Sequence, residues 1–304
     1  MIILNTLFPL FALLLLGKVL KLNGVTSDLF LKTADKLVYY IFFPVMLFWK
    51  VGSSAPGGTS SAALCMAGGL AVFLVFIVSL IYIRRGGVDR FGAGSFSQAA
   101  YRFNTYIGMA VVLAVLGKEG VRHFGVLIGV LIPVINVMAV SVLIWYSDRD
   151  LPTGSKIRYF IKALVSNPLI LGCAGGILMS RAGVGFPAFL NNTFALVSSV
   201  TLPLALISIG GTLSFKGITR YGRQAIVASL FKQVLLPVTG FILLKIFGVG
   251  DIQFRVGMIF FCLPTSTALY VLSAQLNSDL ELASTAIMVS TLLSFVSLSV
   301  ALVL

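Results

Sequence analysis

The chain has 304 residues, of which 59% are hydrophobic and only 10% are charged, and its mean hydropathy is +1.07. A water-soluble domain of this length could not bury so much apolar surface, so the composition predicts an integral membrane protein. The excess of 22 Lys and Arg over 9 Asp and Glu lies almost entirely in short gaps between apolar runs. This placement favours lipid headgroups as partners, and the absence of a basic groove with interleaved aromatic residues argues against nucleic acid.

Apolar stretches of about 20 residues, the length of a helix that crosses a bilayer, recur along the chain. The ten predicted spans are 3–20, 36–51, 61–83, 95–117, 122–146, 159–180, 188–214, 224–247, 253–276 and 281–303. The gaps between them are short, so we expect no inserted soluble domain, and the most polar gap, "YSDRDLPTGSK", is typical of a linker. The first stretch carries its positive charges after the apolar run and lacks a small-residue cleavage site, which indicates a retained span and not a signal peptide.

Landmarks in the first half recur in the second half at a nearly constant offset, which predicts an internal repeat. Pro44 begins "PVML" in the second span, and Pro203 begins "PLAL" in the seventh. Asn104, in the fourth span, follows Pro44 at almost the same distance at which Pro264, in the ninth, follows Pro203. Each half has an odd number of spans, so the second half must enter the membrane with opposite polarity. The sequence thus predicts an all-α membrane protein whose ten transmembrane helices form a five-plus-five inverted repeat.

The basic residues predict the orientation of this repeat. More Lys and Arg lie in the gaps after the first, third, fifth and seventh spans than in the gaps after the second, fourth, sixth and eighth. Positive residues favour the cytoplasm, so we expect both termini outside, in a multi-pass protein of the plasma or inner cell membrane. The chain then divides into a first repeat (1–146), a cytoplasmic linker (147–158) and a second repeat (159–304).

Polar, helix-breaking residues interrupt two predicted spans at corresponding positions. In the ninth span, Pro264 is followed directly by three hydroxyl side chains within "FFCLPTSTALYVL", and the fourth span contains "YRFNTYIG". In inverted-repeat transporters, substrates bind near the bilayer midplane where a helix of each half is broken. The sequence therefore predicts that helices 4 and 9 are broken and cross. The predicted substrate-binding residues are Arg102, Asn104, Thr105, Gly108, Pro264, Thr265, Ser266 and Thr267, with Asn136 and Lys232 as accessory candidates.

The chemistry of the two breaks favours an anion. The start of a half-helix exposes free N–H groups and a positive dipole end, and the guanidinium fork of Arg102 suits a carboxylate. Each residue also has a structural interpretation. Proline kinks are common in membrane helices and are repaired by Ser and Thr, Arg102 and Lys232 can snorkel to the interface, and Asn136 suits a helix–helix hydrogen bond. The matching positions of the two breaks favour the functional interpretation.

Acidic residues are expected to be missing from the midplane, because all nine fall in gaps or near span ends. Proton coupling through a buried acid is therefore poorly supported. The three cysteines lie far apart in apolar segments, and the single histidine, His123, lies at a span end. The sequence thus predicts no catalytic residue, no metal and no cofactor, which argues against an intramembrane enzyme.

Several stretches of the chain resemble the auxin efflux carrier family, the PIN-like bacterial permeases. They are "YRFNTYIGMAVVLAVLGKEG", "IPVINV", "SNPLILGCAGGIL", "LPLALISIGGTL", "FKQVLLPV" and "LPTSTALYVLSAQLNSDLELAST". The resemblance implies a fold like that of the bile acid–sodium symporters, with spans 1, 2, 6 and 7 as an often dimeric scaffold. Spans 3–5 and 8–10 would form a transport domain whose spans 4 and 9 cross near the site. It also implies transport of organic anions, including auxin and small dicarboxylates, by an elevator-like movement.

The chain departs from the family pattern at one position. Many relatives have Gly-x-Pro in the fourth span, whereas this sequence has Gly108-Met109-Ala110. We therefore expect the first break to be less sharp than the break at Pro264.

The predicted function is a secondary transporter for a small organic anion such as a mono- or dicarboxylate, in contact with membrane lipid and paired as a homodimer. Two alternatives stay open. One is a cation-coupled symporter of a bile-acid-like amphipathic solute, and the other is a non-transporting receptor with the same fold. Fold alone does not separate these functions, whereas a measurement of flux does.

Overall fold

The computed structural model describes residues 2–53, 61–146, 168–183, 185–213 and 217–303. Within these residues the secondary structure is helical and no β-strand occurs, which confirms the predicted all-α class. The helices before the predicted linker are α1 (Ile2–Leu22), α2 (Asp28–Leu37), η1 (Val38–Phe42), α3 (Phe43–Gly52), α4 (Ala62–Tyr82), η2 (Ile83–Gly87), α5 (Arg90–Tyr101) and α6 (Thr105–Tyr146). The helices after it are α8 (Pro168–Ala182), α9 (Ala188–Thr212), α10 (Ile218–Leu230), η3 (Phe231–Leu235), α11 (Leu236–Ile246), α12 (Asp251–Cys262), α13 (Ala268–Gln275) and α14 (Leu280–Val303). The predicted linker 147–158 and the first part of the predicted span 159–180 lie outside the described residues.

Several helical runs have the length and composition needed to cross a membrane. Among the described residues they are Ala62–Gly87, Arg90–Tyr146, Ala188–Thr212, Ile218–Ile246 and Leu280–Val303. Large apolar side chains face outward on these helices, and Leu196 and Val303 are 72% and 76% exposed. A surface of this kind is suited to lipid and not to water. The structure is therefore that of a multi-pass membrane protein.

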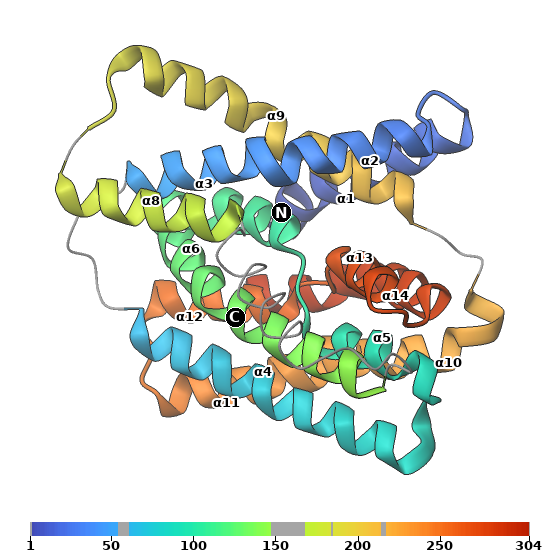
Figure 1. Cartoon of the computed structure of the whole chain (residues 1–304). Coiled ribbons are helices and arrows are strands. Elements are labelled where there is room, and N and C mark those ends of the chain that lie inside the picture. The colour runs from blue at the N-terminus through green and yellow to red at the C-terminus, as the bar shows by residue number, and fades with distance from the viewer. Residues whose placement is uncertain (1, 54–60, 147–167, 184, 214–216, 304) are drawn as a thin grey trace.

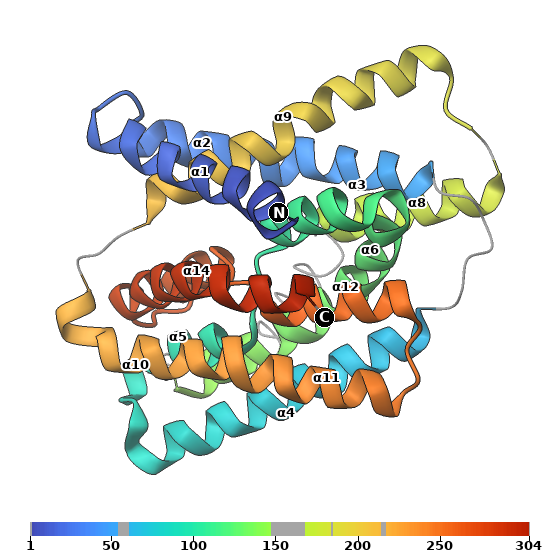
Figure 2. The ribbon, with the colours of Figure 1, turned by 180° about the vertical axis from the view of Figure 1, so that it is seen from behind.

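The helices form layers that can be followed in both views of the molecule. Helices α1, α2, α3, α8 and α9 lie together on one side, and α4, α5, α10 and α11 lie on the opposite side (Figures 1 and 2). Helices α6, α12, α13 and α14 lie between these two groups (Figure 1). In the first group α1 packs on α9, and α3 packs on α8 and α9. Helix α12 packs on α6 and on α14, and α11 joins α4 to α12.

Glycines allow the closest helix contact within the first group. A Cβ atom on Gly17 of α1 would lie 2.8 Å from the backbone carbonyl carbon of Ile207 in α9. A Cβ atom on Gly210 of α9 would likewise lie 2.6 Å from the carbonyl carbon of Leu14. Small residues let membrane helices approach until their backbones touch, which gives van der Waals packing in place of a hydrophobic driving force.

The long helix α6 joins the second part of the predicted span 95–117 to the predicted span 122–146. Its helical path is interrupted at Gly117, where φ is 59° and ψ is −147°. This positive φ lies in a region that glycine reaches without the steric cost that a Cβ atom imposes. The predicted boundary between the two spans is thus a kink within one helical run.

Candidate functional site

The first break lies between α5 and α6, at residues 102–104. Arg102 has an extended backbone, with φ of −64° and ψ of 155°, so the chain leaves the helix after Tyr101. The side-chain Oδ1 of Asn104 then accepts hydrogen bonds from the backbone N–H groups of Tyr106 and Ile107, at 3.0 and 3.1 Å. Asn is among the best N-capping residues because its oxygen satisfies such otherwise unpaired donors. Asn104 therefore starts the second half of the broken helix without help from a proline.

The second break lies between α12 and α13, at residues 263–267. Leu263 has an extended backbone, with φ of −64° and ψ of 147°, and the next residue is Pro264, which has no N–H to donate. The backbone N–H of Thr265 donates to Ser290 Oγ of α14 at 3.1 Å, and Ser266 Oγ accepts from the N–H of Ala268 at 3.2 Å. This break is longer than the first.

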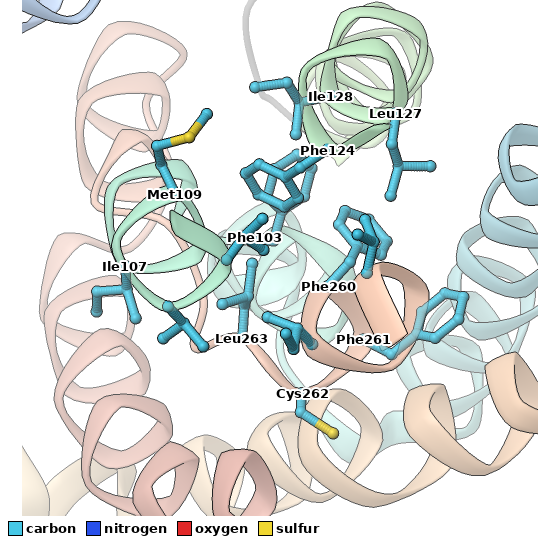
Figure 3. Packing of buried hydrophobic residues seen from close by; sticks show 14 of the residues in the cluster. Phe103, Ile107, Met109, Phe124, Leu127, Ile128, Phe260, Phe261, Cys262 and Leu263 are labelled. Atoms are coloured by element: carbon cyan, nitrogen blue, oxygen red, sulfur yellow. The ribbon is translucent and has the colours of Figure 1, made fainter. Parts of the chain in front are cut away.

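The two breaks touch at one point. The backbone N–H of Asn104 donates to the carbonyl oxygen of Pro264 over 2.8 Å. Beside this bond the rings of Phe103 and Phe260 meet edge to face, with centroids 4.6 Å apart, and Figure 3 shows both rings between α6 and α12 together with Leu263. The structure therefore brings the residues predicted from the two halves of the sequence to a common crossing.

Gly108 lies in the packing around this crossing and is buried. A Cβ atom at this position would lie 2.5 Å from Cζ of Phe124 and 2.6 Å from Cδ1 of Leu263. The missing side chain of Gly108 therefore allows the second break to approach the start of α6 closely.

Arg102 is held inside the protein by two amides. Its Nη1 donates to Gln98 Oε1 and its Nη2 donates to Asn136 Oδ1, both at 2.9 Å, and the side chain is only 8% exposed. In the described residues the ion pairs are Lys21–Asp28 and Arg220–Glu281. Arg102 thus keeps its positive charge next to the first break without a carboxylate partner among the described residues, and Asn136 fixes the direction of its guanidinium group.

Lys232 lies in the π-helical segment η3 and is fully buried. Its Nζ donates to the backbone carbonyl oxygen of Phe261 at 2.8 Å, close to the end of α12. A snorkelling lysine would keep its ammonium group in water, whereas this ammonium group points into the protein beside the second break.

The predicted residues differ in their exposure. Thr105, Ser266 and Thr267 are half-buried, whereas Arg102 and Asn104 are buried. Pro264 and Thr265 are buried as well. Within the described part of the chain, Thr265 Oγ1 has no hydrogen-bond partner. The accessible polar groups of the crossing are therefore the starts of α6 and α13.

A cavity of about 220 Å³ lies elsewhere, between α4 and the last turns of α6, and Arg84 and Trp145 are part of its lining. None of the predicted site residues lines it. The described residues also contain no cluster of His, Cys, Asp and Glu that could hold a metal ion.

Four polar residues that support the crossing were not predicted from the sequence. They are Gln98, Gln233, Ser290 and Ser297, all of which are buried. Gln98 could have been found, because it precedes Arg102 by one helical turn on α5, where side chains four residues apart meet. The others come from helices distant in sequence, and no local pattern distinguishes them from residues that face lipid.

Comparison with known proteins shows what the chain is similar to. A family model described as membrane transport protein matches residues 155–302. An uncharacterized transporter of Methanothermobacter thermautotrophicus is 25% identical over 97% of this chain and 95% of its own length. A putative malonate transporter of Rhizobium meliloti is 24% identical over 86% of this chain and 82% of its own length. An ileal sodium/bile acid cotransporter of Oryctolagus cuniculus is 30% identical over 36% of this chain and 32% of its own length. These matches confirm the resemblance of the chain to the auxin efflux carrier (PIN-like) family of membrane transport proteins.

Proposed function

We propose that this protein carries a small organic anion, such as a mono- or dicarboxylate, and that the anion binds where the two broken helices cross. The observation that carries the proposal is the hydrogen bond between the N–H of Asn104 and the carbonyl of Pro264. It joins the two interrupted helices at one point inside the bundle, and discontinuous helices of this kind form the substrate sites of many transporters. The similarity to a putative malonate transporter supports a carboxylate.

The helix starts at the crossing favour negative charge. Helix α6 begins at Thr105 and α13 begins at Ala268, and the positive end of the helix dipole at each start favours an anion. Thr105, Ser266 and Thr267 are half-buried at these starts and add hydroxyl donors. A carboxylate at the crossing would thus meet donors from both helices.

Buried groups behind these donors complete the proposed site. Arg102 supplies a positive charge without a carboxylate partner in the described residues, and its fork fits a carboxylate in two-point contact. The hydroxyl of Thr265 is buried without a partner among the described residues, and such groups cost free energy unless a ligand or water satisfies them. Asn104 and Gly108 then shape the crossing, and Asn136 positions Arg102.

The layers suggest how the anion is moved. We propose ten spans in a five-plus-five inverted repeat, 1–146 and 159–304, joined by a cytoplasmic linker at 147–158. The layer of α1–α3, α8 and α9 would be the scaffold and the dimer contact, and the remaining helices would be the transport domain (Figures 1 and 2). Both breaks belong to the second group, so a sliding of this group against the scaffold would carry the crossing as an elevator. Both termini would lie outside the plasma or inner membrane.

The test is flux in proteoliposomes. The purified protein is reconstituted into liposomes that are loaded with labelled malonate, other dicarboxylates, monocarboxylates or indole acids. Exit of the labelled acid is followed at a set membrane potential. A potential of about 100 mV, negative on the side of the anion, favours its exit by ~2.3 kcal/mol per charge. We expect potential-driven exit for one acid class, abolished in Arg102→Ala and unchanged in Arg84→Ala, whose arginine is exposed outside the crossing. Exit that persists in Arg102→Ala would remove the crossing from the mechanism, and binding without any flux would indicate a receptor.

The bile acid cotransporter relatives favour a second candidate function, a sodium-coupled symport of an amphipathic acid. Their similarity covers less than half of this chain. The same liposomes separate the two functions, because a symporter accumulates its solute against a gradient only when a sodium gradient is imposed, whereas an uncoupled anion carrier responds to the potential alone.

A further inference from the structure

The C-terminal end of α12 gathers a set of oxygen atoms next to the crossing. The last carbonyl groups of a helix have no partner within it and carry the negative end of the helix dipole. Here the carbonyls of Phe261, Cys262 and Leu263 point to side chains of η3 and α14. Ser297 Oγ donates to the carbonyl oxygen of Cys262 at 3.0 Å, and Gln233 Nε2 donates to the carbonyl oxygen of Leu263 at 3.4 Å.

Oxygen atoms of this kind are the ligands that a small cation prefers. In transporters with broken helices, unwound backbone carbonyls and half-helix C-termini coordinate sodium or protons. Ser297 Oγ also contacts Gln233 Oε1, which adds a hydroxyl and an amide oxygen to the same group of atoms. The positive group found among them is the ammonium of Lys232, which donates to the carbonyl of Phe261 at 2.8 Å.

No carboxylate of the described residues forms an ion pair with the ammonium group of Lys232. The side chain is fully buried. A buried charge costs more than an apolar side chain of the same size when stability alone matters. Packing alone therefore does not explain a lysine at this position.

We propose that the end of α12 is a monovalent-cation site which the chain fills permanently with the ammonium group of Lys232. The tethered ammonium neutralises the dipole end beside the crossing in every transport cycle, so movement of the anion requires no dissolved coupling cation. This second part rests on the proposed anion transport, whereas the cation site itself does not.

The test empties the site and refills it from solution. Lys232→Ala removes the ammonium and leaves space for a small cation, whereas Lys232→Met fills the space without charge. We expect the thermal stability and flux of Lys232→Ala to fall, flux by about tenfold as for a lost charged hydrogen bond. Methylammonium should restore both, sodium or potassium should restore them in part, and choline should not because it is too large. The flux of Lys232→Met should stay low with every cation. The flux and stability of the wild type and of Lys36→Ala, whose lysine is exposed on α2, should not change with any of these cations.

Two results would overturn the proposal. One is wild-type flux and stability in Lys232→Met, which would show that the charge is not needed. The other is a Lys232→Ala variant that no small cation stabilises. If Lys232→Ala does not fold, the flux of Lys232→Met decides between the outcomes. Flux at the wild-type level would contradict the proposal, whereas loss of flux in the folded variant would support it. If the wild type moves no organic anion, the melting curves of Lys232→Ala with methylammonium still decide whether the cation site exists.

Discussion

Asn104 lies in the first helix break and Pro264 in the second, and a single backbone hydrogen bond of 2.8 Å joins them. Proline breaks the second helix because it lacks a donor and cannot continue the turn. Asparagine breaks the first by capping the helix that follows it, through bonds to Tyr106 and Ile107. Two different residues thus produce the same local result.

Replacing Asn104 should separate its capping role from the chemistry of the substrate. Asn104→Ala removes the cap and should lower the free energy of unfolding by about 1 kcal/mol. Asn104→Asp keeps an oxygen acceptor, so its stability should stay near that of the wild type, but its negative charge should repel an anionic substrate. Thermal unfolding and flux measured on both variants check the prediction. Wild-type flux in Asn104→Asp would place the anion away from the first break.

The bond between Arg102 and Asn136 should be visible in a double-mutant cycle. Hydrogen bonds to charged groups contribute about 1.5–3 kcal/mol, so Arg102→Met and Asn136→Leu together should destabilise less than the sum of the two single changes. Unfolding in detergent gives the coupling energy. A parallel cycle of Arg84→Met with Asn136→Leu should be additive within about 0.5 kcal/mol, and similar coupling in both cycles would contradict the assignment.

The unpaired hydroxyl of Thr265 should matter for the ligand and not for the fold. Thr265→Val removes a buried group that has no partner among the described residues, so stability should be unchanged or rise by up to about 1 kcal/mol. Flux and ligand-induced stabilisation should fall, because an apolar methyl group cannot bond to a carboxylate. Ser290→Ala is the contrasting variant, because it removes the acceptor of the Thr265 N–H and should destabilise the protein. A clear loss of stability in Thr265→Val would show that the hydroxyl serves the fold.

An added side chain at Gly108 should lower the stability of the protein because the surrounding residues are closely packed. Gly108→Ala places a methyl group against Phe124 and Leu263, and overpacking of this kind costs about 1–3 kcal/mol. Gly129 lies on the same helix α6 with nothing within 4 Å of an added Cβ. Gly129→Ala should therefore be neutral or stabilising by about 0.5–1 kcal/mol. Equal effects of the two changes on the melting temperature would refute the close approach of the second break to the start of α6.

Composition and local pattern were sufficient to predict the helical class and the positions of both breaks. The proline and hydroxyl cluster after Cys262 predicts the second break directly, because helix-breaking residues are costly in an apolar span. The role of Asn104 was only half predicted, since the same side chain can donate to a ligand or accept from the backbone. Its capping bonds depend on the backbone path of residues 102–104, which the sequence does not specify.

Other features depended on folding in three dimensions. Helix α2 begins at Asp28, before the predicted start of the second span at residue 36, because Leu31 and Ala34 are buried while Lys32 and Thr33 between them stay exposed. An amphipathic start of this kind has too little hydrophobicity to be counted as a span. The contacts of Arg102 with Asn136, and of Lys232 with Phe261, join helices far apart in the chain and leave no periodic signal.

The bond between Asn104 and Pro264 also has a consequence for biosynthesis. At roughly 5–20 residues per second, Pro264 leaves the ribosome about 10–30 s after Asn104, because roughly 160 residues separate them. During this interval the first half is in the membrane with an unpaired amide at its break, which lipid cannot satisfy. The nascent first half must therefore stay beside the translocon, a chaperone or trapped water until the second half arrives, so a chain truncated before Pro264 should be a substrate for membrane quality control.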